Sequence, residues 1–321
     1  MNKPRIAVVG AGSFGSNHAR VLRQMENVAF AGVFDANKDQ AQKVAQQHDT
    51  VALESLENLD AAVVATPTVT HEEVATRLLN SGVDVLVEKP IADSAEAGER
   101  LTKIAADNGR ILQVGHLERF NPAVLALEKA VTIPLFFEVH RMSVFTPRSL
   151  DVDVVLDLMI HDLDIVLNLT KAMPDEIRAA GISVLSRKVD IANVRLSFAS
   201  GCVANLTASR VSTEKVRKLR LFQPSEYLSV DYARQDATRV AVKGIGQIGF
   251  EQLPVSPGEP LKLELEAFVT AVVQRSKPQV DGEQATRALR LAEAILDKIQ
   301  EHAGLVDRTL QLHASCTTHI D

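Results

Sequence analysis

Three groups of residues in this sequence have the types and spacing that catalysis requires. In the first, Glu88-Lys89-Pro90 follows the apolar run 83–87. Open α/β sheets bind ligands at the carboxyl ends of their strands, which is where this lysine would lie. Lys89 can donate a hydrogen bond to a substrate hydroxyl or, if its pKa is lowered, help to remove the hydroxyl proton. The proline favours extended backbone at Lys89, although an ordinary surface turn would read the same way.

The second group is a polar stripe in the apolar segment 151–170. Asp153, Asp157, His161, Asp164 and Asn168 follow one another at intervals of 4, 4, 3 and 4, which places them on one side of a buried helix. One turn apart, Asp157 can hold the His161 imidazole in one tautomer and raise its basicity. A structural network, a metal site and a general acid/base pair all fit this pattern. We prefer the acid/base pair and expect no metal, because no second histidine cluster supplies matching ligands.

The third group is a glycine-rich turn that fits G-x-G-x-x-G. Gly10, Gly12 and Gly15 lie between the apolar run 5–9 and a helical segment, with Ser13 and Phe14 inside the same turn. Such a turn lets the backbone approach a pyrophosphate, and the following helix N-terminus offers free N–H groups. Asp35 stands 20 residues after Gly15, at the end of the next strand, where a carboxylate binds a ribose 2′-hydroxyl and repels a 2′-phosphate. The turn and Asp35 together therefore predict an NAD-binding site. The alternative is a glycine-rich turn without a ligand beside a solvated aspartate.

The elements that must position these residues fall into two halves. Apolar runs at 5–9, 28–34, 61–65, 83–87 and 111–114 alternate with helical segments at 37–48, 70–81 and 94–108. This alternation predicts a doubly wound parallel sheet in a cofactor domain, residues 1–119. A helix near 121–130, a strand at 133–143, the helix 151–170 and consecutive strands from 176 to 253 follow. They predict an α+β domain, residues 120–321, with a large open and mostly antiparallel sheet.

Two helices near 260–275 and 283–303 and a loose polar tail from 313 complete the expected chain. The broad sheet would leave one apolar face uncovered, so we expect a homodimer or homotetramer.

Composition excludes several classes of protein. The 321 residues include 46% hydrophobic and 24% charged, enough for a buried core, and the formal net charge of −6 argues against nucleic-acid binding. No apolar stretch is long enough to span a membrane, and no signal-peptide pattern begins the chain. Two cysteines, Cys202 and Cys316, make no disulfide framework. We expect a cytoplasmic enzyme or small-molecule binder.

A family resemblance covers essentially the whole chain. It rests on an ordered set of motifs: Gly10-Ala11-Gly12-Ser13-Phe14-Gly15 with His18, Ala65-Thr66-Pro67-Thr68 with His71, Glu88-Lys89-Pro90, and Asp157-x3-His161-x2-Asp164. Together they resemble the Gfo/Idh/MocA (glucose-fructose oxidoreductase / inositol dehydrogenase) family.

The resemblance implies a Rossmann domain, NAD, and hydride transfer on sugar or cyclitol hydroxyls. It implies that Lys89, Asp157 and His161 are catalytic, that Thr66, Pro67 and His71 cover the nicotinamide side, and that Glu88 and Lys89 border the cofactor. One departure is Met159, where the family usually has glycine.

Segments 115–124 and 151–167 resemble the family members that oxidise the 3-hydroxyl of UDP-N-acetylglucosamine before a transamination in lipid A synthesis. A nucleotide-sugar diphosphate suits arginine forks. The candidates for binding this substrate are Arg119, Asn121, Asp164, Arg141, Arg148 and Arg210. The residues do not decide whether Lys89 or His161 is the base. Another sugar or cyclitol dehydrogenase, an NAD-dependent glycosidase and a non-catalytic nucleotide sensor remain as alternatives.

Overall fold

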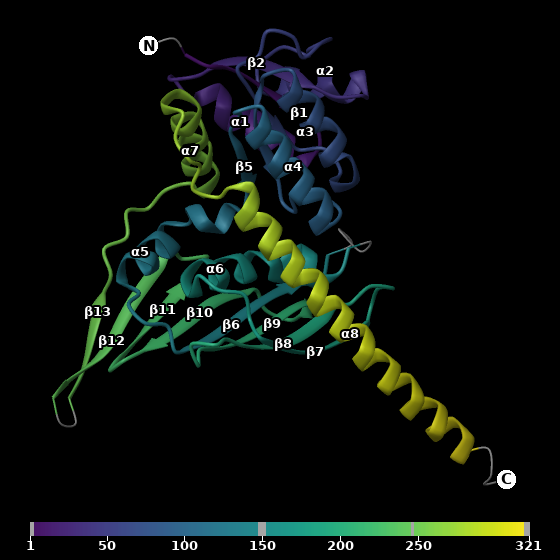
Figure 1. Ribbon diagram of the computed structural model, residues 1–321, viewed down its shortest axis with the longest axis vertical. Helices are drawn as coiled ribbons and strands as arrows, with labels where there is room; N and C mark the ends of the chain where they lie inside the picture. Colours follow the sequence, from purple (N-terminus) through teal and green to yellow (C-terminus); the bar gives the residue numbers. More distant parts are fainter. Residues whose placement is uncertain (1–2, 147–151, 245–246, 318–321) are drawn as a thin grey trace. The chain divides into compact units, whose positions relative to one another are not determined.

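The chain folds into two compact units. The computed structural model describes residues 3–146, 152–244 and 247–317, and beyond residue 306 it describes side chains only at Arg308 and Thr309. One unit contains Met1–Asn121 and Gly258–Leu289, and the other contains Pro122–Pro257 and Arg290–Asp321. Figure 1 shows the elements of both units along the chain.

The first unit is built on a five-stranded parallel sheet with the order β2-β1-β3-β4-β5. Its strands are β1 (Arg5–Val9), β2 (Ala29–Phe34), β3 (Ala61–Val64), β4 (Asp84–Glu88) and β5 (Leu112–Gly115). The helices are α1 (Ser13–Gln24), α2 (Lys38–Gln47), α3 (His71–Asn80), α4 (Ala95–Asp107), α7 (Pro260–Gln274) and the beginning of α8 (Gly282–Thr317), with short turns η1 (Thr68–Thr70) and η2 (Leu117–Phe120). The predicted doubly wound sheet is confirmed.

Alternation of apolar residues explains why the strands of this sheet are buried on both faces. Ile6, Val8, Val63 and Leu86 form one core with α1 and α7, while the residues between them face the opposite side, where α3 contacts β3 and β4. Because the strand order reverses between β1 and β3, the loops after these two strands open the crevice in which such sheets bind ligands.

Helix α7 belongs to this first unit, although it follows the second-unit strands in sequence. Leu265, Phe268, Val269 and Val272 join the core around α1, and Arg275 pairs with the buried Asp84 of β4. The expected division into 1–119 and 120–321 therefore differs from the compact units. The first ends at Asn121 and also contains Gly258–Leu289.

The second unit contains an eight-stranded sheet with the order β13-β12-β11-β10-β6-β9-β8-β7. Its strands are β6 (Phe136–Val144), β7 (Glu176–Ile182), β8 (Ile191–Ser197), β9 (Val203–Ser212), β10 (Val216–Gln223), β11 (Glu226–Asp231), β12 (Asp236–Gly244) and β13 (Gln247–Gln252). Neighbouring strands pair antiparallel except β6 and β9, which are parallel. The expected open, mostly antiparallel sheet is confirmed.

Helices α5 (Pro122–Ala130) and α6 (Ile160–Thr170), with the π-helical turn η3 (Val155–Met159), lie along one face of this sheet (Figure 1). Along β8, for example, Ala192, Val194 and Leu196 are buried, whereas Asn193 and Arg195 between them are exposed. The uncovered face is therefore polar along β8, whereas Phe136, Phe222 and Tyr227 form an aromatic cluster on β6, β10 and β11. The strands alternate in polarity, so most of their apolar residues point to the helix-covered side.

Helix α8 is longer than the sequence suggested. It runs from Gly282 to Thr317, past the expected end near residue 303 and through most of the segment expected to be a loose tail. Among the described residues, no helix combines the length and apolar character that a bilayer-spanning segment needs.

Candidate active site

The glycine turn joins β1 to α1 at the point where the strand order reverses. Gly10 has a φ of +104°, and a Cβ there would lie 2.5 Å from the carbonyl oxygen of Ala65, so the loops after β1 and β3 touch. A Cβ on Gly15 would overlap the carbonyl oxygen of Gly10. By contrast, the space over Gly12 is open, and no side chain caps α1 there. An uncapped helix N-terminus under open space suits a pyrophosphate.

Asp35 is held beside this turn by backbone hydrogen bonds. Its Oδ2 accepts from the Ala11 N–H at 2.6 Å, and its Oδ1 accepts from the Asn37 N–H at 2.8 Å. The carboxylate is half-buried, and each oxygen keeps capacity for a further donor. Gln40 stabilises the same turn by donating from Nε2 to the carbonyl oxygen of Ala11 at 2.8 Å. These contacts fit the predicted ribose-binding role.

Ser13 and Phe14 begin α1 at the surface. Both are exposed, and Phe14 keeps 62% of its surface accessible. An aromatic side chain this exposed next to the glycine turn is available to a bound dinucleotide.

The loop after β3 is tied to the loop after β4 by His71. Its Nδ1 lies 2.9 Å from the Pro90 carbonyl oxygen, and its Nε2 lies 2.9 Å from the Thr66 carbonyl oxygen. Burial lowers the pKa of His71 despite these carbonyl contacts, which favour the charged form. Because His71 is only 1% exposed, we expect it to position Thr66 and the exposed Pro67 rather than to touch a cofactor itself.

Lys89 lies at the carboxyl end of β4, and its peptide bond to Pro90 is cis. The preceding Glu88 accepts from the Lys89 N–H through Oε2 at 3.3 Å and contacts His18 Nε2 through Oε1 at 2.6 Å. His18 belongs to α1, three residues beyond Gly15. Glu88 thus links the helix that begins at the glycine turn to the peptide that carries Lys89. The place of Glu88 beside the cofactor stays a prediction, and these contacts suit a residue that positions Lys89.

Asp157 and His161 lie where the segment 151–170 changes its helical geometry. Asp157 is inside the π-helical turn η3, and His161 is the second residue of α6. Both are half-buried, whereas Met159 between them is 1% exposed. Single π-helical turns occur frequently at functional sites because they re-aim side chains on an otherwise regular helix.

The two ends of the predicted stripe have structural partners. Asp153 accepts from the Val189 N–H at 2.8 Å, and Asn168 donates to Glu128 of α5 at 2.8 Å. Asp164 is 2% exposed within α6. The stripe is therefore not one continuous polar surface, since the π-helical turn shifts the side chains that precede it.

The second-unit arginines expected to bind substrate are held in buried ion pairs. Arg141 donates to both oxygens of Asp162 at 2.6 and 2.9 Å, with side chains 3% and 2% exposed. Tyr232 donates to the same carboxylate at 3.0 Å, and its ring lies 4.9 Å from the guanidinium. The sequence gave no sign that Asp162 is the partner of Arg141. Asp162 does not belong to the polar stripe of the segment 151–170, so the helical spacing did not single it out.

Arg210 has a similar environment. It donates to the carbonyl oxygen of Val152, and its Nε lies 3.7 Å from Asp190 Oδ1. Burial opposes ionisation of Asp190, but hydrogen bonds from Ser186, Leu185 and Val184 outweigh it and lower its pKa to about 2. Arg148 lies outside the described residues.

Arg119 and Asn121 are buried in the first unit, at 3% exposure each. Gln279 donates to the Arg119 carbonyl oxygen at 3.1 Å, and Asn121 donates to Glu118 at 3.2 Å. We propose that the buried residues Arg141, Arg210 and Asn121 shape the site rather than bind the substrate diphosphate directly.

Comparisons with known proteins agree with this geometry. Residues 4–116 match the family described as "Oxidoreductase family, NAD-binding Rossmann fold", and residues 135–223 match the "GFO/IDH/MocA C-terminal domain". The chain belongs to the Gfo/Idh/MocA family. It is an NAD-dependent oxidoreductase acting on CH–OH groups, and the open space over Gly12, the uncapped α1 and the carboxylate of Asp35 fit that cofactor.

Relatives of known activity match this Gfo/Idh/MocA chain over most of its length. A UDP-N-acetylglucosamine 3-dehydrogenase of Acidithiobacillus ferrooxidans is 36% identical over 301 residues, which cover 90% of this chain and 95% of the relative. A solved structure of that enzyme superposes with a TM-score of 0.89 over 94% of this chain and 99% of the other, at 34% identity. An inositol 2-dehydrogenase of Rhizobium meliloti is 25% identical over 92% of this chain and 97% of the relative.

Proposed function

We propose that this oxidoreductase converts the 3-hydroxyl of UDP-N-acetylglucosamine to a 3-keto group. The observation that carries the proposal is the 36% identity with a UDP-N-acetylglucosamine 3-dehydrogenase, which extends over 90% of this chain and 95% of the relative. A match of this extent includes both units, so it supports the proposal for the segments predicted to recognise the sugar as well as for those predicted to bind the dinucleotide.

Three residues of this chain carry the chemistry. We assign the hydroxyl proton to His161, which Asp157 orients, and a hydrogen bond on the same oxygen to Lys89. NAD+, when bound, supplies the acceptor for the hydride. As the proton leaves, negative charge develops on the oxygen, and the Lys89 ammonium stabilises this charge better than it stabilises the neutral hydroxyl.

A substrate panel tests the proposal directly. We expect NADH absorbance to rise when the enzyme and NAD+ receive UDP-N-acetylglucosamine, and to rise far less with UDP-glucose, free N-acetylglucosamine or myo-inositol. A coupled transaminase that removes the keto product should increase the yield. Equal rates with myo-inositol would replace this substrate with a cyclitol, and release of sugar without net NADH would replace the reaction with glycoside cleavage.

Two variants test the residue assignments. Lys89→Ala and His161→Ala should lose at least a hundredfold in kcat and keep NAD binding, because both residues act on the reacting oxygen. Lys103→Ala on α4 and His140→Ala on β6 remove the same side-chain types elsewhere and should have kcat close to that of the wild type. If Lys89→Ala and His161→Ala both turned over at the wild-type rate, the assignment would be refuted.

We further propose a cytoplasmic enzyme whose 3-keto product is transaminated to a diamino sugar for lipid A. The 3-keto group supports this, because a ketone is the acceptor that a transaminase requires. Detection of the 2,3-diamino sugar nucleotide in an extract that contains the enzyme, and its absence when the enzyme is deleted, would test the order of the two steps.

We propose self-association, as a homodimer or homotetramer, through the uncovered face of the sheet. Phe136, Phe222 and Tyr227 form an aromatic cluster there, with ring centroids 5.8 and 5.2 Å apart. Half-exposed aromatic residues among arginines are typical of protein interfaces. Phe222→Glu should shift the mass measured by light scattering toward the monomer, and an unchanged mass would place the interface elsewhere.

A further inference from the structure

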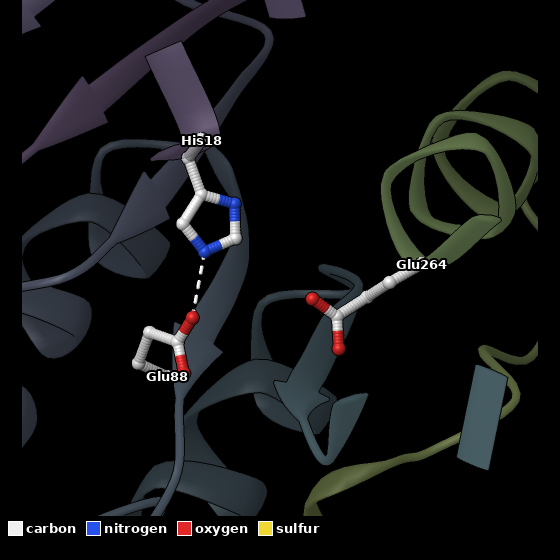
Figure 2. Close-up of side chains that lie close together, drawn as sticks. All are labelled: His18, Glu88 and Glu264. Atoms are coloured by element: carbon white, nitrogen blue, oxygen red, sulfur yellow. Dashed lines mark hydrogen bonds and ion pairs between the residues drawn. The ribbon is translucent and has the colours of Figure 1, made fainter. Parts of the chain in front are cut away.

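Three ionisable side chains from distant parts of the sequence meet inside the first unit. His18 comes from α1, Glu88 from the end of β4, and Glu264 from α7 (Figure 2). One donor atom from each lies within 4.8 Å of the others. His18 and Glu264 are 0% exposed, and the Glu88 side chain is 15% exposed.

Only one pair in this cluster is closed by a short contact. His18 Nε2 lies 2.6 Å from Glu88 Oε1. Figure 2 shows the carboxyl group of Glu264 pointing toward this pair, with Nδ1 on the edge of the His18 ring that faces it. Among the described residues, neither carboxyl oxygen of Glu264 nor Nδ1 of His18 has a hydrogen-bond partner. A buried carboxylate in this position would be an uncompensated charge.

The charges around the cluster decide which carboxyl group keeps a proton. Burial raises the pKa of Glu88, but the hydrogen bond and charge of His18 and the charge of Lys89 outweigh it, so the pKa ends below its ordinary value. Burial and then the negative charge of Glu88 raise the pKa of Glu264 well above its ordinary value. From β5, Gln113 faces α7 by donating to the Glu264 backbone carbonyl oxygen at 3.1 Å.

We propose that Glu264 is a protonated positioning residue whose buried carboxyl group packs beside the Nδ1 edge of His18 and keeps the contact between His18 and Glu88 in place. The pair in turn holds the peptide of Lys89, since Glu88 also accepts from the Lys89 N–H at 3.3 Å. Glu264 therefore acts on the reacting oxygen only through Glu88 and Lys89. The expected effect of Glu264 on turnover rests on the proposed role of Lys89. The protonation state of Glu264, by contrast, is independent of the substrate.

A metal ion is the competing occupant, because one histidine and two carboxylates form a common donor set. The geometry favours the proton. His18 Nε2 and Glu88 are already joined at 2.6 Å, whereas two ligands of one zinc-like ion, each at about 2.1 Å from the metal, lie roughly 3.4 Å apart. The 0% exposure of Glu264 also leaves it without contact to solvent.

Infrared difference spectroscopy tests the proton without any substrate. The wild type minus Glu264→Gln spectrum should contain the C=O band of a protonated carboxylic acid at neutral pH, shifted in D2O. Glu266→Leu, two positions along α7, should leave the band in place. Absence of the band would overturn the proposal. So would about one metal ion per chain in elemental analysis of the wild type that is lost in Glu264→Gln.

Turnover tests the positioning. Glu264→Gln keeps a neutral polar group of the same size beside His18 and should retain most of the wild-type kcat. Glu264→Leu should lower kcat about tenfold with the NAD Kd unchanged, because small misplacements of a catalytic group are costly. Equal kcat in both variants would overturn the positioning role. If no sugar is oxidised by the wild type, the proposed substrate has failed, and the infrared band still decides the state of Glu264.

Discussion

Replacing Asp35 with serine should weaken NAD binding about a hundredfold. The Asp35 carboxylate accepts the N–H groups of Ala11 and Asn37 at 2.6 and 2.8 Å and keeps one lone pair on each oxygen for the two ribose hydroxyls. Hydrogen bonds to a charged acceptor contribute about 1.5–3 kcal/mol each. Loss of both, partly replaced by water and the serine hydroxyl, amounts to about 3 kcal/mol, or roughly two decades in Kd.

The measurement is a fluorescence titration of the dinucleotide into wild type and variant, with NAD and NADP in parallel. Asp35→Ser should reduce the preference for NAD over NADP in two ways. It weakens NAD binding because the ribose contacts are lost, and it strengthens NADP binding because the 2′-phosphate is no longer repelled. Asp39→Ser takes a similar negative charge from the exposed first turn of α2 and should leave both Kd values within about twofold. An Asp35→Ser variant that binds NAD within threefold of wild type would refute the assignment of the ribose contact.

Three further predictions concern the second unit. Arg141→Met should lower the free energy of unfolding by about 3–5 kcal/mol, on the order of 10 °C in the calorimetric Tm, because it leaves Asp162 buried and uncompensated. The double variant Arg141→Met with Asp162→Leu should recover most of this stability. A normal Tm with a raised KM in Arg141→Met would instead make Arg141 a substrate ligand. Asp190, with its pKa lowered to about 2, contributes roughly 2 kcal/mol of folding stability, which is present above pH 4 and lost as the pH falls through 2. The stability of Asp190→Asn should therefore not fall over this pH range in an acid-unfolding series, and a fall equal to that of the wild type would contradict the prediction. Burial raises the pKa of Cys202 to about 11, so a thiol reagent should modify Cys202 only after denaturation, and rapid modification of the native protein would contradict its burial.

The sequence was most informative where the site is local. The glycine turn, α1 and Asp35 lie within one β-α-β unit, and the steric demands of that turn apply to consecutive residues. Lys89 could be placed for the same reason, because the end of an apolar strand is visible in the sequence. The parallel and antiparallel sheets were also predictable, since helices separate the strands of the first sheet and are absent between those of the second from β7 to β13.

The arginines show what such reasoning leaves open. A charged residue beside a site segment can face a ligand or a buried partner, and the sequence spacing of Arg141 and Asp162, 21 positions apart, does not distinguish the two. Glu264 left a weaker signal. It shares the inner face of α7 with Phe268 and Ala271, so helical periodicity marks it as a buried acid.

Residue types and local spacing by themselves determined the two sheets, the dinucleotide turn and the candidate catalytic residues, because backbone geometry and apolar periodicity act over a few turns or one strand. Tertiary structure alone decided that α7 completes the first unit, that Glu264 reaches Glu88 across 176 positions, and that Arg141 and Arg210 are held in ion pairs. Long-range packing chooses which charges are buried together, and that choice depends on the whole fold rather than on any one segment.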